Sequence, residues 1–425
     1  MAGSKDQIDD ETIRFHRVVA EGSLEELRDL LGRGVEVDVP GHAGQTALML
    51  AFESKDLEKS KLLIQHGADP ELTDDFNDTA LRHAVEADFA DGVRLLLSLD
   101  VDRGYQPRYP LKKVEYETLL PEPEMPEEMK GILSEAEWKE SWEQTKASMR
   151  EWGQNPEVQP MICSVGSLEV LKLFLEAGDD LNQAPTERKR ELVGLGAQRD
   201  LRVSPEEYQR HKSPRFGSQN PERMDYPFWR EMVKTGGNAY AARVQFQDKD
   251  AFTKPGVVWC YERFGSTLTP LADGRFVQIG GEHEDYYDPD FFIYNDVVIY
   301  DGKGEFQIYG YPRDVFPPTD FHTATLGRDG IYIVGCLGYP EQRRSEFTPV
   351  YRLSPDSWKI EPIATTGKMP GWISNHHARF DSRRNAIHVS GGQIHVNDDA
   401  EGTTSISNPH QYELDLNRLH WRRLD

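Results

Sequence analysis

A 33-residue repeat in the first hundred residues is the feature that most narrows what this chain can fold into. Thr46-Ala47-Leu48 recurs as Thr79-Ala80-Leu81, and Gly34 recurs as Gly67 at the same interval. Apolar pairs keep the same register, namely Leu30-Leu31, Leu63-Ile64 and Leu96-Leu97. A unit of this length cannot bury its own apolar face, so neighbouring copies must stack. The repeat therefore predicts an array of short paired helices.

The repeat resembles the ankyrin repeat, which has a turn, two short amphipathic helices and a closing Gly-Ala-Asp turn. The best match runs over residues 44–51 and 61–69, although Met49 and Arg82 stand where the family has histidine. A further unit over residues 165–178 shares the tetrapeptide Gly-Ser-Leu-Glu with residues 22–25. The threonine that opens a repeat is expected to cap its first helix. The resemblance implies a protein-binding surface.

The predicted helical domain spans residues 10–182 and carries an insertion at about 103–158. The insertion begins with a proline-rich stretch, after which residues 127–152 are expected to form one helix with tryptophans on one side. Residues 183–254 belong to no repeat and are expected to be a linker that packs on the C-terminal part of the chain. Two short helices are predicted within this linker, near residues 227–232 and 239–244.

From residue 255 to residue 425 the apolar pattern alternates, as in β-strands. Apolar strands end in glycine at Gly280, Gly335 and Gly391, which lie 55 and 56 residues apart. A strand containing tyrosine follows each of them, and Trp358 and Trp421 are expected to occupy one equivalent position in the fourth strand.

Four strands per unit in this order resemble the kelch repeat of β-propellers. The fold class expected is therefore multidomain α + β, an N-terminal ankyrin α-solenoid followed by an all-β, kelch-like partial propeller of three four-stranded blades. The combination resembles ankyrin-repeat proteins, mainly from bacterial genomes, that carry a kelch-like tail. Three blades leave an open side, which either the linker or a second copy of the chain in a homodimer is expected to cover.

Composition narrows the possible partners. The chain has 49 Lys and Arg against 73 Asp and Glu, a net charge of -24, which argues against nucleic acid or an anionic membrane as the main partner. Three cysteines cannot build a disulfide framework, and the first residues do not resemble a secretory signal. We therefore expect a reduced, cytoplasmic protein.

Candidate ligand residues cluster in the β-rich half. The stretch 281–290 is expected to be an acidic loop between two strands, and a divalent cation is the alternative to simple solvation. Two further histidines begin strands and could approach the end of a central channel. The ligand or metal candidates are His283, Glu284, Asp285, Asp288, Asp290, His322 and His376. No cofactor is otherwise expected.

Catalytic motifs are missing from the sequence: it has no Gly-x-Ser-x-Gly, no His-Glu-x-x-His and no P-loop. We therefore expect an interaction or adaptor protein that binds another protein, rather than an enzyme. A small-molecule or metal-assisted enzyme at the propeller end and an antitoxin-like immunity protein are the alternatives. Because solenoids vary at their loop tips, the partner-binding candidates are His42, Gln45, Asp75, Phe76 and Asp78.

Overall fold

The computed structural model describes residues 10–105, 138–139, 158–196, 198–248, 256–285, 288–398 and 402–425. The chain divides into a helical unit, Met1–Arg188, and a β-rich unit, Lys189–Asp425. Within the described ranges, no helix has both the length and the apolar character needed to cross a lipid bilayer.

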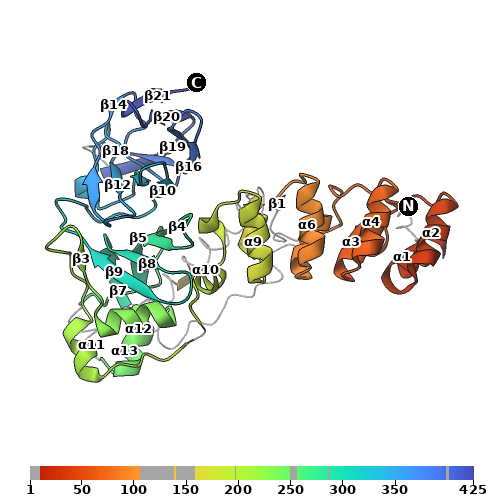
Figure 1. Ribbon diagram of the computed structural model, residues 1–425, viewed down its shortest axis with the longest axis horizontal. Coiled ribbons are helices and arrows are strands. Elements are labelled where there is room, and N and C mark those ends of the chain that lie inside the picture. The colour runs from red at the N-terminus through yellow and green to blue at the C-terminus, as the bar shows by residue number, and fades with distance from the viewer. Residues whose placement is uncertain are drawn as a thin grey trace. The chain divides into compact units, whose positions relative to one another are not determined.

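The helical unit is a row of short paired helices (Figure 1). The first helices of successive pairs pack side by side, with α3 between α1 and α5, and the second helices α2, α4 and α6 form a parallel row. The bounds are α1 (Asp10–Glu21), α2 (Leu24–Gly32), α3 (Ala47–Glu53), α4 (Leu57–Gln65), α5 (Ala80–Glu86) and α6 (Ala90–Ser98).

The repeat phase expected from the sequence is confirmed by the helix ends. Thr46 and Thr79 cap α3 and α5 by accepting a hydrogen bond from the backbone N–H three residues on. Gly67 follows α4 with φ of 91°, a left-handed conformation that glycine adopts without strain. Leu63, on α4, is completely buried. The helices therefore begin, end and face inward where the 33-residue period places them.

The inserted segment leaves the stack continuous. Helix α9 (Leu168–Glu176) packs directly against α6, so the late unit continues the row of helices. The two ends of the insertion meet where β1 (Gly104–Tyr105) pairs with β2 (Gln159–Pro160). The helix expected over residues 127–152 lies outside the described residues, apart from 138–139.

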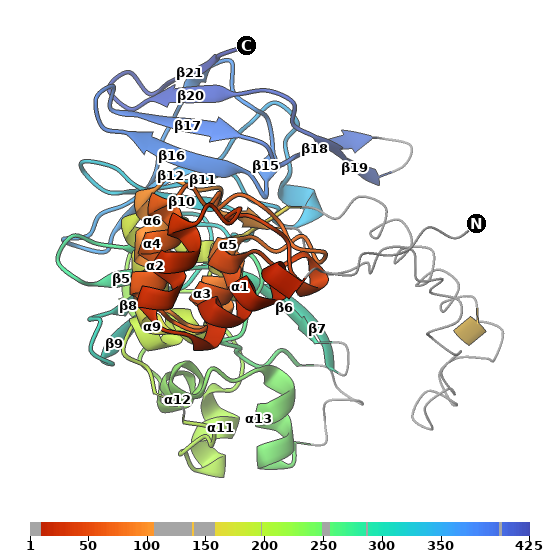
Figure 2. The same ribbon diagram turned by 90° about the vertical axis from the view of Figure 1, so that its right-hand side faces the viewer.

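The β-rich unit contains three sheets that each have four antiparallel strands arranged in chain order. The third sheet also carries β14 (Thr366–Gly367), which pairs parallel with its last strand. The first comprises β4 (Thr267–Pro270), β5 (Phe276–Ile279), β8 (Val297–Tyr300) and β9 (Phe306–Gly310). The second comprises β10 (Thr323–Leu326), β11 (Ile331–Val334), β12 (Val350–Leu353) and β13 (Ile360–Pro362). The third comprises β16 (His377–Asp381), β17 (Ala386–Ser390), β20 (Tyr412–Asp415) and β21 (His420–Arg423), which Figure 2 shows side by side.

All three sheets carry an insertion between their second and third strands. In the first sheet it is the hairpin of β6 (Glu282–Asp285) and β7 (Asp288–Ile293). In the third sheet it is the hairpin of β18 (Gln393–Asp398) and β19 (Gly402–Ser407), on which β15 (Ile373–Ser374) also pairs. In the second sheet, residues 335–349 form a loop with a single turn of 3₁₀ helix, η6 (Pro340–Gln342). The insertions thus occupy the same position in all three sheets, although two are hairpins and one is a loop.

Apolar side chains fill the spaces between consecutive sheets. One core cluster joins the first and second sheets, for example through Val277, Ile299 and Ile333, and another joins the second and third. The first strand of the second sheet, β10, also lies against the first strands of the other two sheets, β4 and β16. The three sheets therefore form one packed β-rich body.

The strand register corrects one expectation about the tryptophans. Trp421 pairs with Leu414, and the residue paired with the equivalent Leu353 is Ile360 rather than Trp358. Trp358 lies in the turn between β12 and β13, with φ of 57°. Both residues are tryptophan, but backbone pairing places only Trp421, which is fully buried, in a fourth strand.

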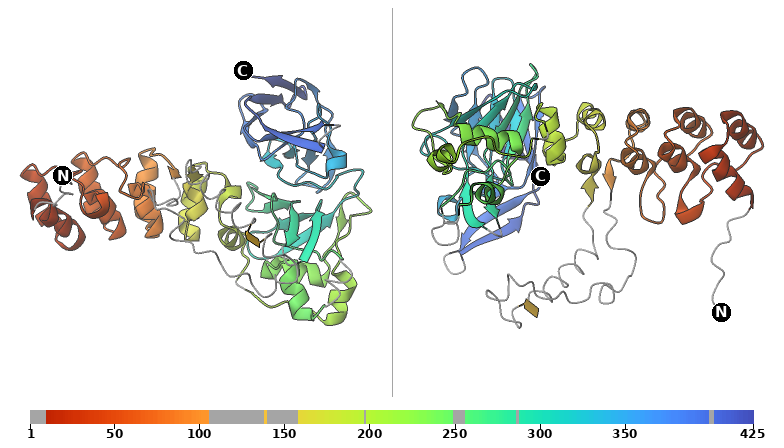
Figure 3. Two further views of the ribbon diagram at one scale, coloured as in Figure 1. Left: turned by 180° about the vertical axis from the view of Figure 1, so that it is seen from behind. Right: turned by 90° about the horizontal axis from the view of Figure 1, so that it is seen from below.

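Three helices between residues 205 and 246 lie beside the first sheet, as Figure 3 shows. They are α11 (Pro205–His211), α12 (Pro227–Thr235) and α13 (Ala239–Phe246), so the two short helices expected in the linker are present. Trp229 of α12 stacks on Trp259 with ring centroids 4.9 Å apart. The strand β3 (Glu222–Arg223) pairs with β9 and thereby occupies the outer edge of the first sheet.

Candidate functional site

The loop tips of the helical unit are tied together by hydrogen bonds. The turn η1 (His42–Gly44) contacts the next tip, since the Asp75 N–H donates to the carbonyl of Ala43 over 2.9 Å. The Asp74 carboxylate accepts from the N–H groups of Phe76 and Asp78, over 2.8 and 3.0 Å. These bonds close the loop that carries Phe76 into a defined shape.

A buried histidine connects this loop to the helices behind it. His83, on α5, contacts the Asp74 carboxylate through Nε2 at 3.2 Å and the Glu53 carboxylate through Nδ1 at 2.8 Å. Gln45 donates its side-chain amide to the same Glu53 oxygen over 2.9 Å. Two adjacent tips are therefore anchored through one network, which holds them in place before any partner binds.

Four of the five partner-binding candidates reach the surface and one does not. His42, Asp75 and Phe76 are exposed, Phe76 to 46%, and Gln45 is half-buried. Asp78 corrects the expectation, because it is completely buried and its carboxylate lies 3.9 Å from Arg82. The sequence places Asp78 in the loop but gives no sign that its side chain turns inward. Asp78 thus stabilises the loop from inside and is not part of its exposed surface.

The acidic stretch of the β-rich unit forms the hairpin β6–β7 rather than the open loop expected from the sequence. His283 and Asp290 are buried and face each other, with Nε2 and Oδ1 3.3 Å apart. The hydroxyl of Tyr294 lies 2.7 Å from His283 Nδ1, and Asp290 accepts from the N–H of Val258 over 3.1 Å. Both side chains are therefore engaged within the protein.

The remaining residues of this stretch are divided between the surface and undescribed positions. Glu284 is exposed. Asp285 and Asp288 pair through their backbones, and their side chains lie outside the described part of the structure. Among the side chains that are described, no three from His, Cys, Asp and Glu are grouped so as to hold a metal ion.

His322 and His376 are buried, and each contacts a threonine that begins the first strand of the preceding sheet. Thr267 lies 2.9 Å from His322 Nε2, and Thr323 lies 2.9 Å from His376 Nε2. Burial, with a neighbouring histidine in each case, lowers the pKa of both imidazoles to about 3. Both rings are therefore neutral at physiological pH and join one sheet to the next.

The cysteines of the β-rich unit are also buried. Burial raises the pKa of the Cys260 thiol to about 12 and raises that of Cys336 as well. Neither thiol ionises at neutral pH, as a nucleophile would have to.

The sequence did not point to a pair of facing carboxyl groups, Glu282 and Asp320. Asp320 is completely buried, and its Oδ1 accepts from the Gly338 N–H over 2.6 Å. Partial burial and the neighbouring Asp320 raise the pKa of Glu282 to about 7. The pKa of Asp320 is also raised, chiefly by its own burial. The pair therefore shares a proton near neutral pH.

This pair makes stability depend on pH in a defined direction. The folded-state pKa of Glu282 lies above its unfolded value of 4.5, so the folded protein holds the extra proton between pH 4.5 and 7. Wild type is expected to gain stability as pH falls through this window. Glu282→Gln cannot ionise, so its melting temperature should exceed that of wild type above pH 7, and the difference should shrink toward pH 4.5.

Thermal melts between pH 4.5 and 8.5 measure this difference. Glu346→Gln, at an exposed position in the same unit, is the matched control and should show no such pH-dependent difference. A Glu282→Gln difference that stays constant across the range would contradict the shared proton.

Comparison with known proteins identifies the first part of the chain. The family model described as ankyrin repeats (3 copies) matches residues 15–105. This region of the chain therefore carries ankyrin repeats, in agreement with the repeat length and the helix pairs. An L-asparaginase of Dirofilaria immitis is 36% identical over 70 residues, which are 16% of this chain. The chain spans only 12% of the length of that protein.

Proposed function

We propose that this protein binds another protein through the tips of its ankyrin loops and acts as an interaction or adaptor molecule. The observation that carries the proposal is the pre-ordered loop that presents Phe76, held by Asp74, His83 and Glu53. An exposed aromatic ring on a rigid support contributes large contact area at low entropic cost. The role proposed is binding rather than catalysis.

The partner proposed has a basic surface around an apolar pocket. Asp69, Glu71 and Asp75 are exposed on the same loop as Phe76, and Leu72 beside them is 37% exposed. A net charge of -24 would also speed the approach of a basic partner. Phe76 would enter the pocket, while the carboxylates would contact its rim.

For the β-rich unit we propose a kelch-like partial propeller whose loops provide a second binding surface. This proposal is supported by the four-stranded antiparallel order of three successive sheets and by the contacts among their first strands. We further propose that the linker, rather than a second copy of the chain, covers the open side. Asn220 exchanges two hydrogen bonds with the backbone of Ile360, β3 pairs with β9, and Trp229 stacks on Trp259. The linker therefore already packs on the first and second sheets of its own chain, which is the support for this proposal.

Truncating the exposed loop residues tests the proposed surface. Phe76→Ala is expected to weaken partner binding by about 2 kcal/mol, roughly 30-fold, as is common for a central aromatic side chain. Adding His42→Ala and Asp75→Ala should weaken it further and reduce its dependence on salt. Partners captured by the wild-type and variant chains are compared by quantitative mass spectrometry, and affinities are then measured with the purified partner.

Leu99→Ala is the control, because Leu99 is 45% exposed at the far end of α6. It should bind like wild type. Equal binding by the triple variant, with its helices intact by circular dichroism, would show that the ankyrin loop tips are not the binding surface.

A further inference from the structure

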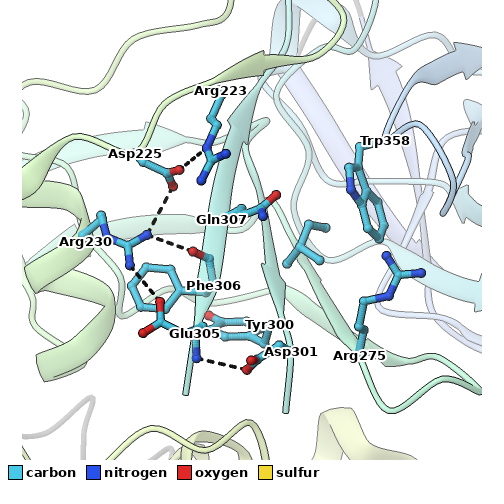
Figure 4. A pocket seen from close by; sticks show the side chains of 11 residues that line it. Arg223, Asp225, Arg230, Arg275, Tyr300, Asp301, Glu305, Phe306, Gln307 and Trp358 are labelled. Atoms are coloured by element: carbon cyan, nitrogen blue, oxygen red, sulfur yellow. Dashed lines mark hydrogen bonds and ion pairs between the residues drawn. The ribbon is translucent and has the colours of Figure 1, made fainter. Parts of the chain in front are cut away.

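The β-rich unit has an open pocket of about 560 Å³ at the outer edge of its first sheet (Figure 4). This volume is within the range of small-molecule sites in proteins, about 300–1,000 Å³. Its walls come from β8, β9, the β3–α12 segment and the turn between β12 and β13. The pocket therefore lies where the first sheet, the second sheet and the linker meet, well away in sequence from the ankyrin loops.

The polar groups of the pocket are already held in position. Asp225 accepts a hydrogen bond from Arg223 and another from the N–H of Ile308, over 2.8 Å. Arg230 donates to the carbonyl of Phe306 over 2.8 Å and lies over its ring at 4.4 Å. These side chains are already ordered in the folded protein, so binding a ligand costs little further conformational entropy.

How far each charged group is exposed to water decides which charges a ligand meets in the pocket. It is lined by three arginines, Arg223, Arg230 and Arg275, and by three acids, Asp225, Asp301 and Glu305. Asp225 is the best shielded of these carboxylates, 16% exposed, and two arginines share it. Glu305 is 82% exposed, so water screens its charge far more strongly. Around Asp225, two guanidinium groups therefore share one shielded carboxylate, whereas Arg275 is paired with Asp273 outside the lining.

Two hydrogen-bond donors in the pocket have no acceptor in the described part of the chain. Arg223 bonds to Asp225 through its Nε, so its two terminal nitrogens remain available to a ligand. The side chain is 59% exposed. The indole N–H of Trp358 is the other donor. The described tryptophans at 229, 259, 372 and 421 each donate their indole N–H to an oxygen. Both donors can therefore serve a ligand that brings oxygen acceptors.

Trp358 packs partly against the core between the first and second sheets and also gives the pocket a flat apolar wall. Its left-handed backbone is held by the Ser354 carbonyl, which accepts its N–H over 2.8 Å. In the equivalent turn of the third sheet Leu419 has nearly the same φ, 52°, so the turn itself does not need tryptophan. The guanidinium of Arg275 lies 4.8 Å from the centre of the Trp358 ring. Figure 4 shows this pair facing Gln307 and Arg223 across the pocket.

We infer that this pocket is a binding site for a small organic anion that joins a planar ring to a carboxylate or phosphate group. The oxyanion binds the free nitrogens of Arg223, which form the paired bonds that guanidinium makes with carboxylate and phosphate. The ring lies against Trp358 and Ile299. Neither a free inorganic anion nor a neutral ring satisfies both halves of the site.

Titration of the full chain, followed by tryptophan fluorescence and calorimetry, tests the inference. The probes are adenosine monophosphate and benzoate, with adenosine and inorganic phosphate as the incomplete counterparts. At least one complete probe is expected to bind at least about tenfold more tightly than either counterpart. Which of the two binds distinguishes a phosphate from a carboxylate ligand. No binding of either at about 5 mM, a concentration that would reveal even a weak site, overturns the inference.

Two variants and a matched control place the binding in this pocket. Arg223→Gln should lower the affinity for the probe about tenfold. Trp358→Leu introduces the residue found in the equivalent turn of the third sheet. It should also lower the affinity and should remove the fluorescence change. Arg344→Gln is the control, since Arg344 also lies over an aromatic ring, that of Phe347 at 5.8 Å, but outside the pocket. Equal affinity of wild type and Arg223→Gln, or weakening by Arg344→Gln alone, contradicts the assignment.

Discussion

Replacing Asp296 by asparagine is expected to lower the free energy of unfolding of the β-rich unit by about 3–5 kcal/mol, because it leaves a buried guanidinium without its counter-charge. The side chains of Arg263 and Asp296 are both buried, and Arg263 Nη2 donates to Asp296 Oδ2 over 3.0 Å. The Trp259 indole N–H donates to the same oxygen over 2.8 Å. The guanidinium also lies 3.4 Å from the centre of the Tyr294 ring. One charged pair thus joins the segment before the first sheet to the sheet itself.

Denaturant unfolding followed by tryptophan fluorescence measures this loss, because five of the eight tryptophans belong to the β-rich unit, at 229, 259, 358, 372 and 421. Asp273→Asn is the matched control. Asp273 pairs with Arg275 in the same way but is 51% exposed, so its removal should leave the midpoint unchanged. A similarly small effect of Asp296→Asn would mean that the buried pair is not needed for folding.

Leu63→Ala is expected to destabilise the helical unit by about 2–5 kcal/mol, the usual cost of removing a fully buried leucine side chain. The effect should be large because a short stack has few neighbouring repeats to support the damaged one. Far-UV circular dichroism of the helices should shift to a lower midpoint, while the fluorescence transition of the β-rich unit stays in place.

Leu99→Ala serves again as the comparison, since this leucine is largely exposed. Its helical transition should remain close to that of wild type. If Leu63→Ala also left the helical transition unchanged, the repeat register would be wrong; if both transitions moved together, the two units would not unfold independently.

The helical unit was predictable because its order is local. A helix cap, a left-handed glycine and a buried leucine recur every 33 residues, and each repeat contacts chiefly its neighbours. The three glycine-ended strands likewise indicated three successive sheets, since the four strands of each sheet lie in chain order even where a hairpin is inserted between them. Both patterns are visible without knowing which distant residues meet.

Trp358 and Asp78 show where such local reasoning fails. Trp358 and Trp421 are the same residue type but occupy different positions. Leu353 pairs with Ile360 whereas Leu414 pairs with Trp421, so only Trp421 lies in a strand. Asp78 stands in a variable loop, yet its side chain turns inward toward Arg82. In both cases the residue type was compatible with two positions, and packing decided between them.

Residue order along the chain was enough to define the repeat length, the helix phase and the strand order, because these depend on residues close together in sequence. Long-range packing was needed to bring Glu282 to Asp320, Arg263 to Asp296, and Arg223 and Trp358 to one pocket. These contacts join segments from different strands and loops. Their free energy comes from burial and charge neutralisation, which arise only once the sheets and the linker have packed, so no local pattern encodes them.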